Sequence, residues 1–277
     1  MTGASTGIGA ASARELARRG FHVIAGVRRE RDADALRADG IEPVILDITE
    51  PDHIARLAAH LGDEPLRALV NNAAIQINAP VETLPLSEWR RQFEVNLFGH
   101  IAVTQALLPA LLRHSGRVVN VSSVGGRIAM ATYGPYAGTK FALEAVSDSL
   151  RRELAPLGVQ VVVVEPGAVR TEMADRVIAT AERLTDAMSP EQRDRYGRLV
   201  RAVNAQSAAH TRRGRPADDA ARVIAEAVTT GRPRTRYTVG RDAALITRLS
   251  RVLPDRLLDR VLAAGLRPHY PSPFSCG

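Results

Sequence analysis

The chain opens with the glycine-rich stretch Thr2-Gly-Ala-Ser-Thr-Gly-Ile-Gly9, directly before a helical pattern over Ile8–Arg19. Glycines at these spacings permit a tight turn and let an anionic group approach the backbone where the helix starts. Free N–H groups and the helix dipole at that point favour a pyrophosphate. A glycine turn alone is also compatible with a plain helix-capping loop, so the rest of the chain must decide between the two.

Outward from this turn, short β-branched runs alternate with longer amphipathic stretches. This alternation predicts an α/β fold, a Rossmann-type doubly wound parallel sheet with helices on both faces in a single domain. The expected strands are His22–Val27, Pro43–Asp47, Ala68–Asn71, Arg117–Ser122, Val159–Glu165 and Tyr237–Val239. The expected helices are Ile8–Arg19, Asp52–Leu61, Ser87–Arg113 (Ser87 as N-cap, a kink at Pro109), Tyr136–Ala155 and Pro216–Thr229.

A doubly wound sheet needs a central strand immediately before the glycine turn, and the sequence shows none there. Buried parallel strands usually run about five residues. We therefore expect the reading frame to be short at its N-terminus.

The composition is that of one large globular domain: 277 residues, 45% apolar and 24% charged. It excludes a disordered chain, a collagen and a small disulfide scaffold. A single cysteine, Cys276, excludes an intramolecular disulfide and a cysteine-based metal cluster, and we expect no metal. Uninterrupted apolar runs are far shorter than the roughly 18 residues of a membrane span. With no signal-peptide pattern at Met1, we expect a cytoplasmic protein.

The formal net charge is +7 and the sequence pI about 10.4, which raises the question of a nucleic-acid partner. The arginines, however, mostly alternate with acidic residues on helical faces, and no basic stripe is interleaved with aromatics. We expect no nucleic-acid partner. Every Lys or Arg position except Lys140 is an arginine, which makes this single lysine informative.

Polar residues stand where successive expected strands end, and parallel strands bind ligands at that edge. These positions and the glycine turn form the expected cofactor site, although Asn and Asp at strand ends are also common turn formers. The residues assigned are Gly3, Ser5, Thr6, Gly7, Ile8, Gly9, Asp47, Ile48, Asn71, Asn72 and Ala73.

Tyr136 and Lys140 are four residues apart on one expected helix, so their side chains share a face. We expect the ammonium to lower the pKa of the phenol, which makes proton exchange with an alcohol or carbonyl feasible near neutral pH. Ser123, after the strand Arg117–Ser122, can donate to the same substrate oxygen. Asn96 can anchor a water behind the lysine. The alternative reads Tyr136 and Lys140 as ordinary helix residues, but an arginine would solvate a surface equally well.

With these motifs together, the sequence resembles the short-chain dehydrogenases/reductases over residues 1 to about 240. The glycine turn, Asn71-Asn-Ala-Ala74, Ser123, Tyr136 to Lys140 and Pro166-Gly-Ala-Val-Arg-Thr171 correspond to the family motifs, with Ala74 in place of a glycine. Two further stretches, 95–100 and 234–243, are similar to the branch holding retinol, 17β-hydroxysteroid and 3-hydroxybutyrate dehydrogenases.

The resemblance implies a role for each matching residue. Tyr136 would be the acid/base, Ser123 would polarise the substrate oxygen, Lys140 would tune Tyr136 and bind the nicotinamide ribose, and Asn96 would serve proton relay. It also implies that the loop after the fifth expected strand holds the nicotinamide, through Pro166, Gly167, Val169 and Thr171.

The end of the first expected strand bears on the choice of cofactor. An acidic residue there accepts the ribose hydroxyls of NAD, whereas this chain has Val27 followed by Arg28 and Arg29. Guanidinium groups suit a 2′-phosphate. We expect NADP(H) to be preferred, with NAD(H) as the alternative, and the general arginine excess as the competing explanation.

Residues 1–240 are expected to form the dinucleotide-binding and catalytic domain, with 171–215 as a helical lid because the strand rhythm stops there. Residues 241–277 form a C-terminal helical extension split by Pro254. We expect it to pack on the sheet or in a homodimer or homotetramer, with a membrane-surface role as the alternative.

The expected function is NAD(P)-dependent oxidation or reduction of a small alcohol or carbonyl, and the alternative is a non-catalytic NAD(P)-sensing or scaffold protein. Four apolar residues, Ile75, Ile77, Ile128 and Met130, suggest a lipophilic substrate of steroid, retinoid or aliphatic type, although they could equally belong to the core.

Overall fold

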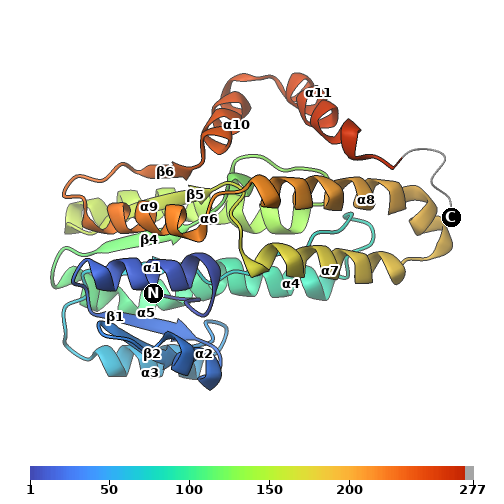
Figure 1. Ribbon diagram of the computed structural model, residues 1–277. Coiled ribbons are helices and arrows are strands. Elements are labelled where there is room, and N and C mark those ends of the chain that lie inside the picture. The colour runs from blue at the N-terminus through green and yellow to red at the C-terminus, as the bar shows by residue number, and fades with distance from the viewer. Residues whose placement is uncertain (272–277) are drawn as a thin grey trace.

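The computed structural model describes residues 1–271, apart from the side chains of residues 241 and 242; Cys276 lies outside this range. Its strands are all parallel and are paired in the order β2-β1 and β3-β4-β5-β6 (Figure 1). This arrangement, with helices on both faces, confirms the doubly wound α/β prediction. The strands are β1 Val23–Val27, β2 Ile41–Ile45, β3 Ala68–Asn71, β4 Arg117–Val121, β5 Gln160–Pro166 and β6 Arg236–Val239.

The space between β1 and β3 is bridged by the first two residues of the chain. The Thr2 N–H donates to the carbonyl of Val70 at 2.9 Å, and the Met1 carbonyl accepts from the N–H of Gly26 at 2.8 Å. Elsewhere the two strands are not paired with each other, and a cavity of about 590 Å³ lies there. Its apolar lining includes Leu16, Val23, Leu57, Leu66, Leu69 and Leu107.

Both faces of the sheet are covered, which explains why β4 is buried along its whole length. Val118 packs with the helices α3 and α5, while its neighbour Val119 packs on the other face with α1 and α9. The helices around the sheet are α1 Gly7–Arg18, α2 Glu30–Leu36, α3 Pro51–Leu61, α4 Leu86–Phe93, α5 Gly99–Leu112, α6 Gly134–Leu154 and α9 Ala217–Thr229. The sequence analysis assigned no element to α2.

The stretch expected as one helix from Ser87 is interrupted. A π-helical turn, Glu94–Phe98, separates α4 from α5, and α5 continues through Pro109. The expected N-cap is wrong: Pro85 occupies that position and Ser87 lies inside α4. By length and composition, the helical stretch Leu86–Leu112 could span a membrane, although the uninterrupted apolar runs of the sequence are too short to predict a span. Half of the most apolar window of this stretch is buried inside the protein.

Residues 171–215 form a helical hairpin, α7 Glu172–Asp186 and α8 Pro190–Arg213, which projects beyond the sheet (Figure 1). Its two ends meet, because the Arg215 N–H donates to the Ala168 carbonyl and the Arg170 N–H to the Arg215 carbonyl. The C-terminal helices are α10 Arg241–Val252 and α11 Asp255–Leu266, separated at Pro254 as expected. Short 3₁₀ turns lie at Val124–Gly126, Ala155–Leu157 and Arg267–His269.

Candidate active site

Ser123 follows the carboxyl end of β4 and caps the 3₁₀ turn Val124–Gly126. Its Oγ accepts a hydrogen bond from the Gly125 N–H at 3.0 Å. A Cβ built on Gly125 would lie 3.3 Å from Cε1 of Tyr136 and 3.4 Å from Oγ of Ser123, so both side chains adjoin this glycine. The absence of a side chain at Gly125 therefore allows the serine and the tyrosine to lie close together.

Tyr136 and Lys140 lie one turn apart on α6, and both are buried, at 8% and 1% exposure. The Lys140 Nζ lies 5.9 Å from the centroid of the Tyr136 ring and donates to the carbonyl of Val121 at 2.9 Å. Because Val121 ends the strand that leads to Ser123, this bond ties the helix to the serine loop. The structure thus brings together Ser123, Tyr136 and Lys140, three of the four residues expected to act in the chemistry.

The expected effect of Lys140 on Tyr136 is wrong for the protein as described here. Burial raises the pKa of Tyr136 to about 12, while the Ser123 hydroxyl acts in the lowering direction. Burial lowers the pKa of Lys140 to about 8, and Glu144 opposes that decrease. The physical reason is that loss of solvent around the phenol dominates the shift in its pKa, while the lysine donates its hydrogen bond to the Val121 carbonyl and not to the phenol. At neutral pH the phenol therefore carries its proton.

Asn96 lies in the π-helical turn and is fully buried. Its Oδ1 accepts from the Ile75 N–H at 2.9 Å, and its Nδ2 donates to the Ile75 carbonyl at 2.8 Å and to Thr139 Oγ1 at 3.1 Å. Thr139 directly precedes Lys140. The amide of Asn96 thus links the loop after β3 to α6. Its role in proton relay stays a prediction.

Asn96 is one rung of a larger array that sequence reasoning missed, which we call the helix ladder: Gln92, Asn96, His100 and Thr104, spaced four residues apart and all buried. They pair in order with Ile77, Ile75, Ala73 and Asn71, which are every second residue from the end of β3 onward. Four helical residues rise about 6 Å and two extended residues about 6.6 Å, so the two repeats match. The detectable signal was four polar residues at helical spacing within an apolar stretch.

The His100 rung has a defined protonation state. Burial, followed by the charge of Lys140, lowers the pKa of His100 to about 3, so the ring is neutral. Its Nε2 lies 2.7 Å from the Ala73 carbonyl and must be the donor. Nδ1 is then an acceptor, and no donor in the described part of the chain reaches it.

The glycine turn fits an anionic ligand. Gly3 and Gly7 have φ angles of +65° and +55°, and a Cβ on Gly9 would lie 2.1 Å from the Gly3 carbonyl oxygen. Thr6, at the N-cap of α1, makes no side-chain capping bond, which leaves the first N–H groups of the helix available. Ser5, like Thr6 and Ile8, is partly exposed. These observations agree with a pyrophosphate cradle of a dinucleotide.

The two asparagines at the end of β3, Asn71 within the strand and Asn72 directly after it, direct their side chains into the protein. Asn72 Nδ2 donates to the carbonyls of Thr2 and Gly3, which fixes the glycine turn. Asn71 Nδ2 donates to Thr104 Oγ1 and to Asn120 Oδ1. The N–H of Ala73 donates to Thr2 Oγ1. Their part in a cofactor site is therefore to shape the loop.

The candidate cofactor residues after β1 and β2 differ in whether their side chains are free to bind a ligand. Asp47 Oδ1 accepts from the N–H and the hydroxyl of Thr49, and Ile48 is buried against Gly99. Arg29 is bound to Asp32 at 2.8 Å. Arg28 is exposed, and in the range 1–271 it forms no hydrogen bond or ion pair.

The loop after β5 connects the nicotinamide candidates to the glycine turn. The Gly167 N–H donates to the Val239 carbonyl at 3.1 Å, and Val169 forms a parallel bridge with Arg215. Thr171 Cγ2 would lie 3.0 Å from a Cβ on Gly7. Pro166 ends β5, so the whole expected set lies at the carboxyl edge of the sheet.

Of the apolar residues considered for a substrate pocket, Ile77 and Ile128 are buried at 6% and 5% exposure. Ile77 packs with Ala79 and Leu84, and Leu184 of α7 contacts the same cluster. Ile75 is only partly buried at the edge of that cluster. These contacts show that the hairpin lies against the segment between β3 and α4.

Comparisons with known proteins agree with this geometry. Residues 1–182 match the family model described as short chain dehydrogenase. Retinol dehydrogenase 16 from Mus musculus is 37% identical over 274 residues, which cover 95% of this chain and 86% of that protein. A short chain dehydrogenase from Burkholderia cenocepacia in complex with NADP has a TM-score of 0.73 at 27% identity, covering 96% of this chain and 94% of the other. One from Burkholderia phymatum in complex with NAD has a TM-score of 0.76 at 24% identity, covering 90% of each chain.

The chain belongs to the short-chain dehydrogenase family, a family of oxidoreductases, as its sequence motifs led us to expect. Within that family it lies in the retinol dehydrogenase branch.

Proposed function

We propose that this protein is an oxidoreductase that interconverts an alcohol and a carbonyl on a lipophilic small molecule, with NADP(H) as its preferred cofactor. The observation that carries the proposal is the convergence of Ser123, Tyr136 and Lys140 at the carboxyl end of β4, beside a glycine turn that suits a dinucleotide. A nicotinamide cofactor, when bound, supplies or accepts the hydride.

Tyr136 is the proton donor in the reducing direction. With its pKa at about 12, the phenol is protonated at neutral pH and can transfer its proton from Oη to the carbonyl oxygen of the substrate. Ser123 lies beside Tyr136 across Gly125 and donates a hydrogen bond to the same oxygen. Lys140 supplies a positive charge one helical turn away, which stabilises the phenolate left on Tyr136 after its proton has moved to the substrate.

The cofactor itself is held by backbone groups and by charge. The free N–H groups at the start of α1 take the pyrophosphate, and the loop Pro166–Thr171 takes the nicotinamide end. The preference for a 2′-phosphate rests on Arg28, which is exposed and has no partner among residues 1–271. Arg29 contributes less because Asp32 already engages it.

The test is a panel of steroid, retinoid, hydroxy-acid and aliphatic substrates, followed by the absorbance of the reduced cofactor with NADPH and NADH. We expect a higher kcat/KM with NADPH, and Arg28→Ala should remove that preference while turnover with NADH stays near that of the parent. A parent that prefers NADH, or an Arg28→Ala protein with an unchanged ratio, contradicts the NADP assignment. A protein inert with every member of the panel contradicts the proposed activity.

We also propose that the hairpin 171–215 is the substrate lid and that the chain works as a homodimer or homotetramer in the cytoplasm. Exposed apolar side chains on the outer helices, Phe98 and Phe141 among them, support association with a second copy. Light scattering on the purified protein tests the assembly. Cell fractionation tests the location, since a spanning Leu86–Leu112 would place the protein in the membrane fraction.

A further inference from the structure

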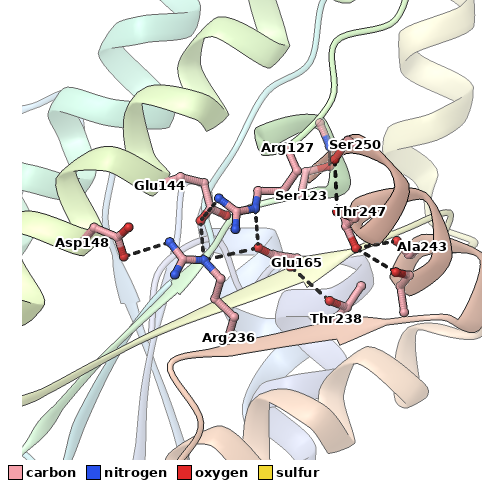
Figure 2. Close-up of polar contacts among 12 residues, drawn as sticks. Ser123, Arg127, Glu144, Asp148, Glu165, Arg236, Thr238, Ala243, Thr247 and Ser250 are labelled. Atoms are coloured by element: carbon pink, nitrogen blue, oxygen red, sulfur yellow. Dashed lines mark hydrogen bonds and ion pairs between the residues drawn. The ribbon is translucent and has the colours of Figure 1, made fainter. Parts of the chain in front are cut away.

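Behind the catalytic residues lies a set of charged side chains that the proposed chemistry does not use. Figure 2 shows them between β5, β6 and α6: Arg127, Glu144, Asp148, Glu165 and Arg236, here called the charged cluster. Glu144 and Glu165 are buried, and both guanidinium groups are mostly covered. With Arg151, which also pairs with Asp148, the positive and negative charges balance.

The contacts are close enough for the cluster to act as one unit. Arg127 Nε lies 3.2 Å from Glu165 Oε1, and its Nη1 lies 3.9 Å from Glu144 Oε2. Arg236 Nε donates to Glu144 Oε2 at 3.0 Å and lies 3.5 Å from Glu165 Oε1. Arg236 Nη2 donates to Asp148 Oδ1 at 2.8 Å. Each guanidinium therefore faces the same two glutamates.

Three members of the charged cluster, Arg127, Glu144 and Glu165, lie within four residues in sequence of a residue of the candidate active site. Arg127 ends the 3₁₀ turn that starts after Ser123. Glu144 lies one helical turn after Lys140 on α6. Glu165 directly precedes Pro166 and Gly167. The cluster therefore joins the serine turn, the lysine helix and the nicotinamide loop, which are not adjacent in the chain.

Gly126 shows how tightly these parts fit. A Cβ built there would lie 2.6 Å from Ser122 Oγ and 3.0 Å from Glu144 Cγ, and also 3.0 Å from the carbonyl oxygen of Lys140. The serine turn thus rests directly on the Lys140–Glu144 turn of α6. A shift of Glu144 would therefore move both the serine turn and Lys140.

Stability is a weak reason for such an arrangement, because burying several charges costs about as much solvation as their attraction returns. Orientation is the better-supported role, since side chains that act in chemistry need a surrounding shell that fixes them within about 0.5 Å. We propose that Arg127 and Glu144, with Glu165 and Arg236, are positioning residues that hold Ser123 and Lys140 in register with the loop Pro166–Thr171. The proposal rests on the activity proposed above.

Glu144 also acts on the charge of Lys140. Its carboxylate opposes the burial that lowers the pKa of Lys140, while His100 faces the same lysine from α5. Glu144 itself is faced by Arg127 from the serine turn, by Arg236 from β6 and by Glu165 from β5, and burial together with Glu165 raises its pKa. Removing the Glu144 charge should lower the pKa of Lys140 further.

The experiment compares Arg127 of the charged cluster with Arg117, a buried arginine at the start of β4. Arg127→Gln removes the cluster member, and Arg117→Gln removes a buried arginine that binds the carbonyls at the end of α9, away from the site. Glu144→Gln removes the charge and keeps the shape, and Arg127→Lys keeps the charge. For each protein we would measure Tm, kcat, KM, the pH profile of kcat, and hydrogen exchange without ligand.

We expect Arg127→Gln to lower kcat by about ten- to a hundredfold. The kcat of Arg127→Lys should lie between those of the parent and Arg127→Gln. In Glu144→Gln, the fall of kcat at high pH, the basic limb of its pH profile, should shift to lower pH. Arg117→Gln should lose a similar amount of Tm and keep the kcat and pH profile of the parent. In hydrogen exchange, residues 122–127 and 165–171 should exchange faster in Arg127→Gln and not in Arg117→Gln.

Two outcomes overturn the positioning role. In the first, Arg127→Gln and Glu144→Gln keep the parent kcat, pH profile and exchange pattern. In the second, kcat falls in Arg117→Gln as it does in Arg127→Gln at matched Tm, which shows a general loss of structure. If the parent protein has no turnover, only the proposed function is refuted, because hydrogen exchange still tests the positioning role of the cluster. If Arg127→Gln does not fold, Arg127→Lys and Glu144→Gln take its place.

Discussion

Two buried polar arrays flank Ser123, Tyr136 and Lys140, and they are built in opposite ways. The helix ladder on α4 and α5 is neutral, regular and local, since its four rungs come from one helical stretch and one extended segment. The charged cluster on the other side is ionic and irregular, and it joins residues as far apart in the chain as Arg127 and Arg236. Both arrays end at α6, where Thr139 meets the ladder and Glu144 meets the cluster.

The difference predicts how each array fails. Loss of one ladder rung leaves a buried neutral group without a partner, which costs about 1–3 kcal/mol, and the other rungs remain. Loss of one member of a buried ionic cluster leaves an uncompensated charge, which costs about 3–5 kcal/mol and disturbs every partner. The ladder should therefore tolerate damage that the cluster does not.

The largest effect is expected at Tyr136, because neither array can supply the proton that its hydroxyl donates. Tyr136→Phe removes the hydroxyl whose proton moves, so turnover should fall by roughly 10² to 10⁴, while cofactor binding and Tm stay close to those of the parent. Tyr133→Phe is the matched control, because Tyr133 lies at the N-cap of α6, three residues before Tyr136, and its hydroxyl pairs with Ser207 of α8. If the Tyr133 variant loses turnover and the Tyr136 variant keeps it, the assignment of the proton donor is wrong.

The next effect is expected on the pH dependence, where activity and stability should move in opposite directions. The pKa of Lys140 is lowered to about 8 from 10.5, so the ammonium is present below pH 8 and is lost as pH rises through that value. Activity that needs the charge should therefore fall above about pH 8. Between pH 8 and 10.5 the unfolded chain binds a proton that the folded chain has lost, so the free energy of unfolding should rise with pH.

Lys140→Arg sharpens this prediction. Arginine stays charged throughout the range, so the basic limb near pH 8 should disappear, and kcat should be lower because a planar guanidinium does not reproduce a single donor to the Val121 carbonyl. Kinetics and urea unfolding measured at the same pH values check both parts. A basic limb that survives in Lys140→Arg would assign it to another group.

The two arrays also show what the sequence can predict. The fold followed from strand and helix patterns, and Ser123, Tyr136 and Lys140 followed from their motif and spacing, because these signals are local. The ladder was visible as polar residues at every fourth position and was overlooked. The cluster could not be predicted, since Arg127, Glu165 and Arg236 come together only through the order of the strands. The pKa of Tyr136 was mispredicted because spacing gives proximity to a charge and says nothing of burial.

A smaller effect is expected from a single ladder rung. His100→Leu removes the donor to the Ala73 carbonyl in a fully buried setting, so the free energy of unfolding should fall by about 1–3 kcal/mol. Cofactor affinity should fall as well, because Ala73 adjoins Asn72, which fixes the glycine turn. Gln92→Leu, at the far end of the ladder, is the control, with a similar loss of stability and unchanged cofactor affinity. Equal affinity losses in both variants would mean that the segment moves as a whole.

The smallest effect is expected at the attachments of the hairpin, which differ from both arrays in being exposed. Glu82 accepts hydrogen bonds from Arg195 and Tyr196 of α8 at 2.6–2.7 Å, and this solvent-exposed set should contribute little to global stability. Glu82→Gln should leave Tm and kcat nearly unchanged. Hydrogen exchange over residues 171–215 should nevertheless rise, since the hairpin loses one of its few attachments and keeps its base at Arg215, the hydrogen bonds Tyr133–Ser207 and Gln206–Gly265, and apolar contacts such as Leu184. In the parent, cofactor with substrate should slow that exchange. If ligands leave it unchanged, residues 171–215 are a fixed part of the site and not a lid, while an unaltered exchange rate in Glu82→Gln would show that the remaining contacts hold the hairpin without Glu82.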